Sequence, residues 1–465
     1  MKSRHFIPIT LAGASALAVY PLFAQEQDES ALNASLSVSQ RFEAGDNIAL
    51  DIPSSGSTQL ATTSLRFNLN SETRTQSLSL SLGGVFREGN VPSRSEISTG
   101  FADPDIRLSY SRGGANALFS IDGRFSQSDV GFVRSIEDFI DQDGEIVLPD
   151  DFDELDGRGK RNNYNLSTQL QTGRNAPIGF VFDAGVSGLY YTDNARAGLT
   201  DSERSRVGVT ALLRFSPVTT GRVALNYDRY DSDDTLQTKR DTYSVNFGVE
   251  NQLFDGTVVD ASLGYTEIDT RETIGSTTRS GVIGQIGLQR PMTNGEITAS
   301  LATTVDQAGD RVTLRFGRNL QLPNGSLSAS LGATSFEGGS PDLVGSLNWQ
   351  YQLARSALSV RLNRTVSTND EDEERLATSA VVNYSYDINT LSSLGLSMDY
   401  GLTDGTGTTN ETERAGISLS YNRSLTRDWT LSTGVSHRIR DEERLGNADS
   451  TSVFVSLSRS FDLLP

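Results

Sequence analysis

The chain has 465 residues, of which 40 are Lys or Arg and 59 are Asp or Glu, so its formal net charge is −19. Only 36% of the residues are apolar, too few for the core of a conventional globular protein of this length, whereas 14 Tyr and 20 Phe are too many for a disordered chain. The acidic balance disfavours binding to nucleic acid, and the absence of Cys excludes a disulfide framework.

The first 24 residues have the order of a secretory signal peptide. Lys2 and Arg4 form a basic start, an apolar segment follows over residues 6–23, and the small residue Ala24 precedes a polar run. We therefore expect export and cleavage after Ala24. The alternative is an uncleaved anchor helix, for which an apolar segment interrupted by two prolines is short, because a membrane-spanning helix needs about 20 apolar residues.

From Leu32 onward, apolar residues occupy every second position in successive blocks, as in 243–249 and 394–402. The residues between them are mostly Ser, Thr, Asn, Asp, Gly and Arg. A period of two is typical of β-strands with one apolar and one polar face. Counting the blocks predicts about 22 strands, within a range of about 18–24, and closed bacterial barrels have an even number.

The connections between the blocks alternate in length and character. The short ones carry turn residues, as in Asp255-Gly256 and Asn324-Gly325. The long ones are acidic, and they are expected at 231–241, 370–375, 441–449 and, longest of all, 127–160. Short turns on one side and long loops on the other are typical of outer-membrane barrels.

Over residues 25–465 the sequence resembles the bacterial outer-membrane β-barrels, a porin-like class, without matching a specific family. The resemblance implies an all-β, transmembrane, antiparallel up-and-down β-barrel with lipid outside and a polar lumen inside. It also implies a Gram-negative cell outer membrane as the location, with periplasmic termini and extracellular long loops. Because Gln25 lies close before the first strand, we expect neither a plug nor a periplasmic domain. The alternative is a soluble β-solenoid or sandwich adhesin.

Five blocks end in an Arg that shares the parity of the apolar residues, and these are Arg112, Arg290, Arg318, Arg423 and Arg459. An Arg on the lipid face costs about 2–4 kcal/mol at the bilayer midplane but only about 0–1 kcal/mol near the interface. We therefore expect these five residues to anchor the periplasmic rim among lipid phosphates. A chance Arg on a half-buried strand would explain one case but not five.

The last block ends at Phe461 and resembles the C-terminal signal that the barrel-assembly machinery reads. That signal usually closes the chain with an aromatic residue, whereas residues 462–465 follow here. The expected partners are therefore this machinery, outer-membrane lipid and lipopolysaccharide.

Catalytic chemistry has little support in the sequence. His5 falls within the expected signal peptide, and His437 shares the outward parity of its neighbours. A hydrolase site needs an inward or loop-borne His, and zinc prefers His and Cys ligands. We expect no enzymatic activity and no cofactor. Loose binding of divalent cations at the acidic loops, shared with lipopolysaccharide phosphates, remains open.

The inward parity is rich in Arg, and ten such residues are candidates for the lumen wall: Arg66, Arg107, Arg124, Arg206, Arg214, Arg222, Arg311, Arg315, Arg361 and Arg438. Inward acids such as Asp105, Asp122 and Asp228 are possible partners for some of them. Two interpretations stay open. One is a porin-like eyelet, with an acidic loop facing an Arg wall. The other is a set of Arg–carboxylate pairs that only stiffens the wall.

Segment 127–160 combines eleven acidic and three basic residues with several apolar ones. A solvated loop has little need of apolar side chains, and folding into the lumen would bury them. The alternative is a flap packed on the rim. The candidate constriction residues are Asp150, Asp151, Asp153, Glu154 and Asp156.

The sequence thus predicts a passive, porin-like conduit for small polar solutes. The alternatives are an exopolysaccharide or other export pore, and a structural or surface-interaction barrel whose lumen is blocked.

Maturation gives the first testable prediction. The protein extracted from membranes should have an intact mass that lacks residues 1–24, because Ala24 offers the small residue that a signal peptidase requires. A mass that retains these residues would contradict the signal-peptide interpretation.

Overall fold

The structure is a computed structural model of the chain. It describes residues 31–54, 56–90, 100–129, 136, 146, 148, 159–193, 199–368, 374–405, 411–443 and 446–464. The expected signal peptide lies outside these ranges.

The described chain folds into 22 β-strands, in agreement with the predicted number and fold class. Their bounds are β1 Ala31–Asp46, β2 Ser57–Glu72, β3 Gln76–Asn90, β4 Gly100–Gly113, β5 Ala117–Asp129, β6 Lys160–Thr172, β7 Ile178–Thr192, β8 Ser202–Ser216, β9 Thr219–Ser232, β10 Lys239–Gln252, β11 Val258–Glu272, β12 Gly275–Met292, β13 Gly295–Val305, β14 Asp310–Leu322, β15 Gly325–Phe336, β16 Asp342–Gln352, β17 Ser356–Thr368, β18 Glu374–Asn389, β19 Ser392–Gly405, β20 Thr412–Ser424, β21 Trp429–Glu442 and β22 Gly446–Leu464. No helix in the described ranges has the length and hydropathy needed to cross a membrane.

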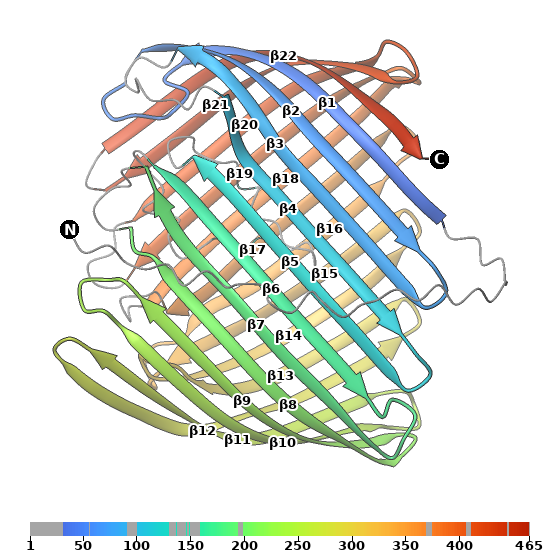
Figure 1. Cartoon of the computed structure of the whole chain (residues 1–465), viewed down its shortest axis with the longest axis vertical. Coiled ribbons are helices and arrows are strands. Elements are labelled where there is room, and N and C mark those ends of the chain that lie inside the picture. The colour runs from blue at the N-terminus through green and yellow to red at the C-terminus, as the bar shows by residue number, and fades with distance from the viewer. Residues whose placement is uncertain are drawn as a thin grey trace, which may run out of the picture.

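Each strand pairs antiparallel with the next one along the chain, and β1 pairs with β22 to close the barrel (Figure 1). The closing ladder runs from Ala34 opposite Leu464 to Gly45 opposite Ser452. A closed ladder leaves no strand edge with unpaired backbone groups, which is the condition for placing β-structure in lipid.

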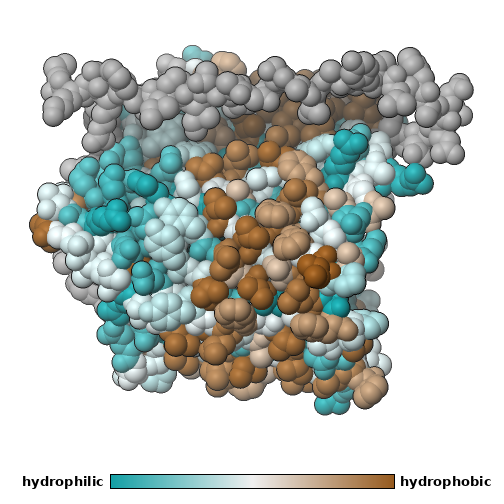
Figure 2. Space-filling view, turned by 60° about the horizontal axis from the view of Figure 1, so that its bottom comes forward, coloured by the Kyte–Doolittle hydropathy of each residue, from teal (hydrophilic) through white to brown (hydrophobic). Residues whose placement is uncertain are grey.

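Apolar side chains cover the outside of this barrel. Leu263 on β11, Ile286 on β12 and Leu331 on β15 each expose about 60% of their surface, at 64%, 60% and 61%. Figure 2 shows such side chains gathered over the middle of one side of the barrel, with hydrophilic ones mostly to the left of them. This outer apolar surface is far larger than water-soluble proteins expose, and no second sheet covers it in the described structure. The soluble solenoid or sandwich interpretation is therefore wrong.

The strands extend further than the alternating pattern predicts. The acidic loops expected at 231–241 and 441–449 are shorter than predicted, because β9 runs to Ser232, β10 starts at Lys239, β21 runs to Glu442 and β22 starts at Gly446. Above the lipid both faces of a strand meet water, so the backbone ladder continues after the apolar alternation has ended.

Two further boundaries differ from the prediction. The last strand does not end at Phe461 but continues to Leu464, which pairs with Ala34 on β1. The longest connection spans 130–159, slightly less than the expected 127–160, because β5 runs to Asp129 and β6 begins at Lys160. Both strands are longer than predicted because backbone pairing continues beyond the residues whose side chains alternate.

The two faces of one strand provide a stability test. Replacing outward Leu263 on β11 by Arg should lower the free energy of unfolding by about 2–4 kcal/mol, because the strand midpoint lies in hydrocarbon. The matched change Ser262→Arg, on the lumen face of the same strand, should cost much less. Denaturant unfolding in lipid vesicles measures both, and equal losses would contradict the assigned faces.

Candidate functional site: the barrel lumen

The ten candidate wall arginines all lie on the face opposite the exposed apolar residues. The register places Arg66 across from Ser37, Arg206 across from Asp228, and Arg361 across from Asn348. The inward residues of adjacent strands share one surface, so these cations lie along the lumen together with Ser, Thr, Asn and Gln. Their surroundings divide them into three groups.

Arginines on the β4–β9 side of the lumen pair with carboxylates. Asp105 lies 3.1 Å from Arg107 and 3.9 Å from Arg124. Asp228 lies 2.7 Å from Arg204 and 3.4 Å from Arg206. These guanidinium groups are half exposed, so each pair adds little stability, at most about 1 kcal/mol. Their effect is to neutralise charge locally along this part of the wall.

Two further arginines make hydrogen bonds or ion pairs with residues near the ends of the barrel. The Arg214 guanidinium donates to the carbonyl oxygens of Gly173 at 2.8 Å and Ala176 at 2.7 Å, and so fixes the turn between β6 and β7. Buried Arg311 lies 3.0 Å from Glu374 and 3.8 Å from Asp306, near the opposite end of its strand. Both arginines hold neighbouring segments in place.

The third group makes no ion pair or side-chain hydrogen bond with any residue in the described ranges. Its members are Arg66, Arg222, Arg315, Arg361 and Arg438. None of the five forms an ion pair with a carboxylate in the described ranges, although Glu250 and Asp260 line the same hollow as Arg222, and the charges of all five lie on the lumen side.

Sequence reasoning missed a further set of lumen-facing arginines near the long-hairpin ends. Arg375 on β18, Arg414 on β20 and Arg440 on β21 expose only 1%, 3% and 4% of their surface, and Arg440 pairs with Glu442. The sequence pattern assigns Arg375 to an acidic loop. Continued counting of inward parity past the last apolar residue would have found all three.

Part of the long connection 130–159 lies against the lumen wall. Ile136 and Ile146, which expose 1% and 2% of their surface, pack on Val381 of β18, which exposes none, and Leu148 packs beside them. Asn363 on β17 donates a 2.7 Å hydrogen bond from its side-chain nitrogen to the Ile146 carbonyl oxygen. We call these five residues the lumen seat.

The depth of the lumen seat in the barrel is given by the place of Val381 on β18. Val381 lies midway along β18 and pairs with lumen-facing Arg361 on β17. The segment carrying Ile136 and Ile146 therefore reaches into the barrel rather than resting only on its rim. The candidate constriction residues 150–156 lie outside the described ranges.

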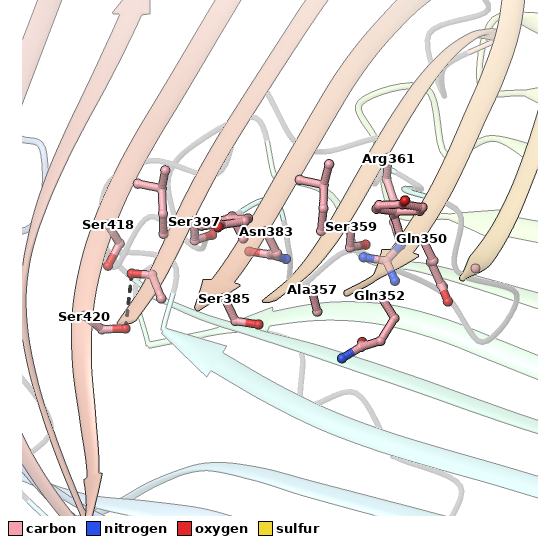
Figure 3. A pocket seen from close by; sticks show the side chains of 16 residues that line it. Gln350, Gln352, Ala357, Ser359, Arg361, Asn383, Ser385, Ser397, Ser418 and Ser420 are labelled. Carbon is pink, nitrogen blue, oxygen red and sulfur yellow. Dashed lines mark hydrogen bonds between the residues drawn. The ribbon is translucent and has the colours of Figure 1, made fainter. Parts of the chain in front are cut away.

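Residues in the described ranges line three hollows along the lumen wall. One of about 550 Å³ spans β16–β20 and is lined by Gln, Asn and Ser side chains with Arg361 (Figure 3), together with two Leu and two Tyr residues of the same strands. A second of about 340 Å³ spans β5–β8 and contains Asp122, Asp183 and the Arg204–Arg206 pair. A third of about 520 Å³ spans β8–β12 and contains Arg222 with Glu250 and Asp260. The first differs from the others because no carboxylate among the described residues lines it.

The five candidate rim arginines face outward near the short turns. Arg318 donates to the Asn294 side-chain oxygen at 2.9 Å. The Arg459 guanidinium carbon lies 5.4 Å from the centre of the Trp429 ring and 4.3 Å from that of Phe461. Arg112 lies opposite Phe119, and Arg423 lies opposite Leu431.

Arg290 reaches the turn between β10 and β11, where it lies 3.8 Å from Asp255. The pKa of Asp255 is lowered first by a side-chain hydrogen bond from Thr257, and further by the Thr257 backbone N–H and the Arg290 charge. The carboxylate is therefore charged at neutral pH and holds this turn beside the rim.

His437 faces outward, as its parity predicts. It pairs with outward Ile417 on β20, and its Nδ1 lies 3.0 Å from the Thr451 hydroxyl on β22. Within the described ranges no group of three His, Cys, Asp or Glu side chains is placed to hold a metal ion.

The fold is similar to that of solved outer-membrane receptors. The iron transporter FrpB from Neisseria meningitidis matches with a TM-score of 0.58 and 9% identity over 92% of this chain and 82% of that one. A ferric enterobactin receptor from Pseudomonas aeruginosa, solved with enterobactin, matches with a TM-score of 0.55 and 11% identity over 94% and 82%. The siderophore receptor PirA from Acinetobacter baumannii gives 0.54 and 9% over 94% and 81%.

No protein-family model matches the sequence, and no curated protein matches it either. The identities of 9% and 11% show a shared fold and leave the substrate open. The chain is thus a 22-strand barrel of the outer-membrane type.

The paired wall gives a test of lumen electrostatics. Asp228→Asn should leave Arg204 and Arg206 without their carboxylate and shift ion selectivity toward anions. The reversal potential across a planar bilayer in a salt gradient measures this shift. Asp228→Glu keeps the charge and serves as the control, and an unchanged reversal potential for Asp228→Asn would show that these side chains do not face the conducting path.

Proposed function

We propose that this protein is a passive conduit for small polar solutes across the Gram-negative outer membrane. The observation that carries the proposal is the lumen wall, which is polar along its length and presents arginines such as Arg315 and Arg361 that form no ion pair with any residue in the described ranges. A wall whose only task was stiffness would pair its charges, as the Asp105 and Asp228 clusters do. Unpaired cations at a solvated wall instead favour passage of solutes and ions.

The lumen seat sets the width of this conduit in the proposal. A barrel of 22 strands encloses a wide lumen. The contact of Ile136 and Ile146 with Val381 narrows it midway along β18. The acidic residues 150–156 of the same connection, which lie outside the described ranges, are proposed as constriction residues from the sequence alone.

The proposed orientation follows from the outward arginines. Arg112, Arg318 and Arg459 lie beside short turns or the C-terminal end, where we place the periplasmic lipid phosphates. The termini are then periplasmic and the long hairpins extracellular, beside lipopolysaccharide. The C-terminal strand, extended to Leu464, would present the signal for the barrel-assembly machinery from this side.

The lumen seat also favours a second candidate, a structural barrel with a blocked lumen. Fully buried isoleucines on Val381 are what a plugging segment would show. Conductance separates the two functions, because a plugged barrel carries no current.

Weakening the contacts of the lumen seat tests the proposed conduit. Val381→Asn places an amide between two buried isoleucines, at a cost of about 1–3 kcal/mol, and should release them from the wall. Single-channel conductance should then rise above that of the unmodified protein. The control Leu212→Asn places the same amide on the lumen face of β8, away from the lumen seat.

An equal conductance for Val381→Asn and the unmodified protein would show that the lumen seat does not limit the pore. Absence of current in every variant would replace the conduit by the blocked structural barrel.

A further inference from the structure

The hollow on β16–β20 lies on the short-turn side of the lumen seat. Val381 pairs with Arg361, and the next inward pair toward the short turns is Ser359 with Asn383. Arg361 and Asn383 line the hollow, and so does Gln350 on the neighbouring strand (Figure 3). A solute that passes the lumen seat along this wall therefore meets the hollow next.

The lining is rich in neutral hydrogen-bonding groups. Amides come from Gln350, Gln352 and Asn383, and hydroxyls come from serines of β17 to β20, such as Ser385 and Ser418. Amides both donate and accept, and hydroxyls do the same, so this lining matches the many hydroxyl groups of a polyol or sugar. Its volume of about 550 Å³ is in the usual range for small-molecule sites, roughly 300–1,000 Å³.

Among the described residues, Arg361 is the single charged one that lines the hollow. It makes no ion pair with a residue in the described ranges, and its buried Nε has no hydrogen-bond partner there. Two neighbouring atoms, Asn348 Oδ1 and Ser359 Oγ, are also buried without a partner in the described structure. The hydrogen-bonding capacity of these three atoms is therefore not used by the residues in the described ranges.

The other two hollows show what a self-neutralised wall looks like. The one on β5–β8 combines Arg204 and Arg206 with Asp122 and Asp183. The one on β8–β12 places Glu250 and Asp260 beside its arginine. Only the β16–β20 hollow, of these three, pairs a cation with neutral groups alone.

We propose that the β16–β20 hollow is a subsite for a sugar acid, a polyhydroxylated ring that carries one carboxylate. The Arg361 guanidinium binds the carboxylate through charged hydrogen bonds, and the amides and hydroxyls bind the ring hydroxyls. This inference rests on the proposed conduit, because it names the class of solute that the conduit favours. Binding is weak enough for release, as passage through a pore requires.

The probe is glucuronate, added to the protein in a planar bilayer, with current interruptions as the readout. The salt concentration is held near 0.1 M, where charges act over about 10 Å. Glucuronate should interrupt the current at concentrations at which glucose and acetate do not. Glucose has the ring hydroxyls without the carboxylate, and acetate has the carboxylate without the ring. Arg361→Gln should weaken this effect at least about tenfold, as loss of a charged hydrogen bond implies.

Arg315→Gln is the matched control, because Arg315 is another lumen-facing arginine without an ion pair in the described ranges and lies outside the hollow. It should leave glucuronate binding unchanged. Equal weakening by Arg315→Gln would overturn the subsite and indicate a general charge effect. Acetate or inorganic phosphate acting as strongly as glucuronate would overturn the assignment of a sugar.

If the protein carries no current, the proposed conduit is contradicted, but the proposed subsite is not. Isothermal titration calorimetry with glucuronate then measures binding to the detergent-solubilised protein directly. Binding that Arg361→Gln removes and Arg315→Gln preserves supports the subsite even in a non-conducting barrel, and absence of binding overturns it.

Discussion

The need to pair every backbone polar group within the lipid governs this structure. The chain meets it by closing the sheet between β1 and β22, so no strand edge is left open. Because backbone pairing holds the barrel together, a packed apolar core is unnecessary. One face of the sheet is then free to meet lipid, and the other is free to carry polar and charged groups along a lumen.

The charged groups of the lumen are distributed unevenly around its wall. On the β4–β9 side, carboxylates such as Asp105 and Asp228 neutralise the neighbouring arginines. On the β16–β20 side, Arg361 stands among amides and hydroxyls, and the apolar contact at Val381 lies next to it. This apolar contact beside a cationic wall is the basis of the functional proposal.

Alternation in the sequence predicts the strands, their faces and their approximate number, because lipid on one side demands apolar residues at every second position. It misses the strand extensions at 231–241 and 441–449, since water on both sides removes that demand. Because the apolar alternation ends there, the sequence pattern also does not show that Arg375 faces inward. Its position depends on the continued backbone pairing of β18. The contact of Ile136 with Val381 joins segments far apart in the sequence, which no local pattern reports.

The most direct test of the account is the conductance of the unmodified protein in a planar bilayer, combined with exclusion of neutral polymers of graded size. The account predicts ohmic steps and a polymer cut-off narrower than the open bore of a barrel with 22 strands, because the contact at Val381 fills part of the lumen. A folded, membrane-inserted barrel that passes no current would contradict a conducting lumen.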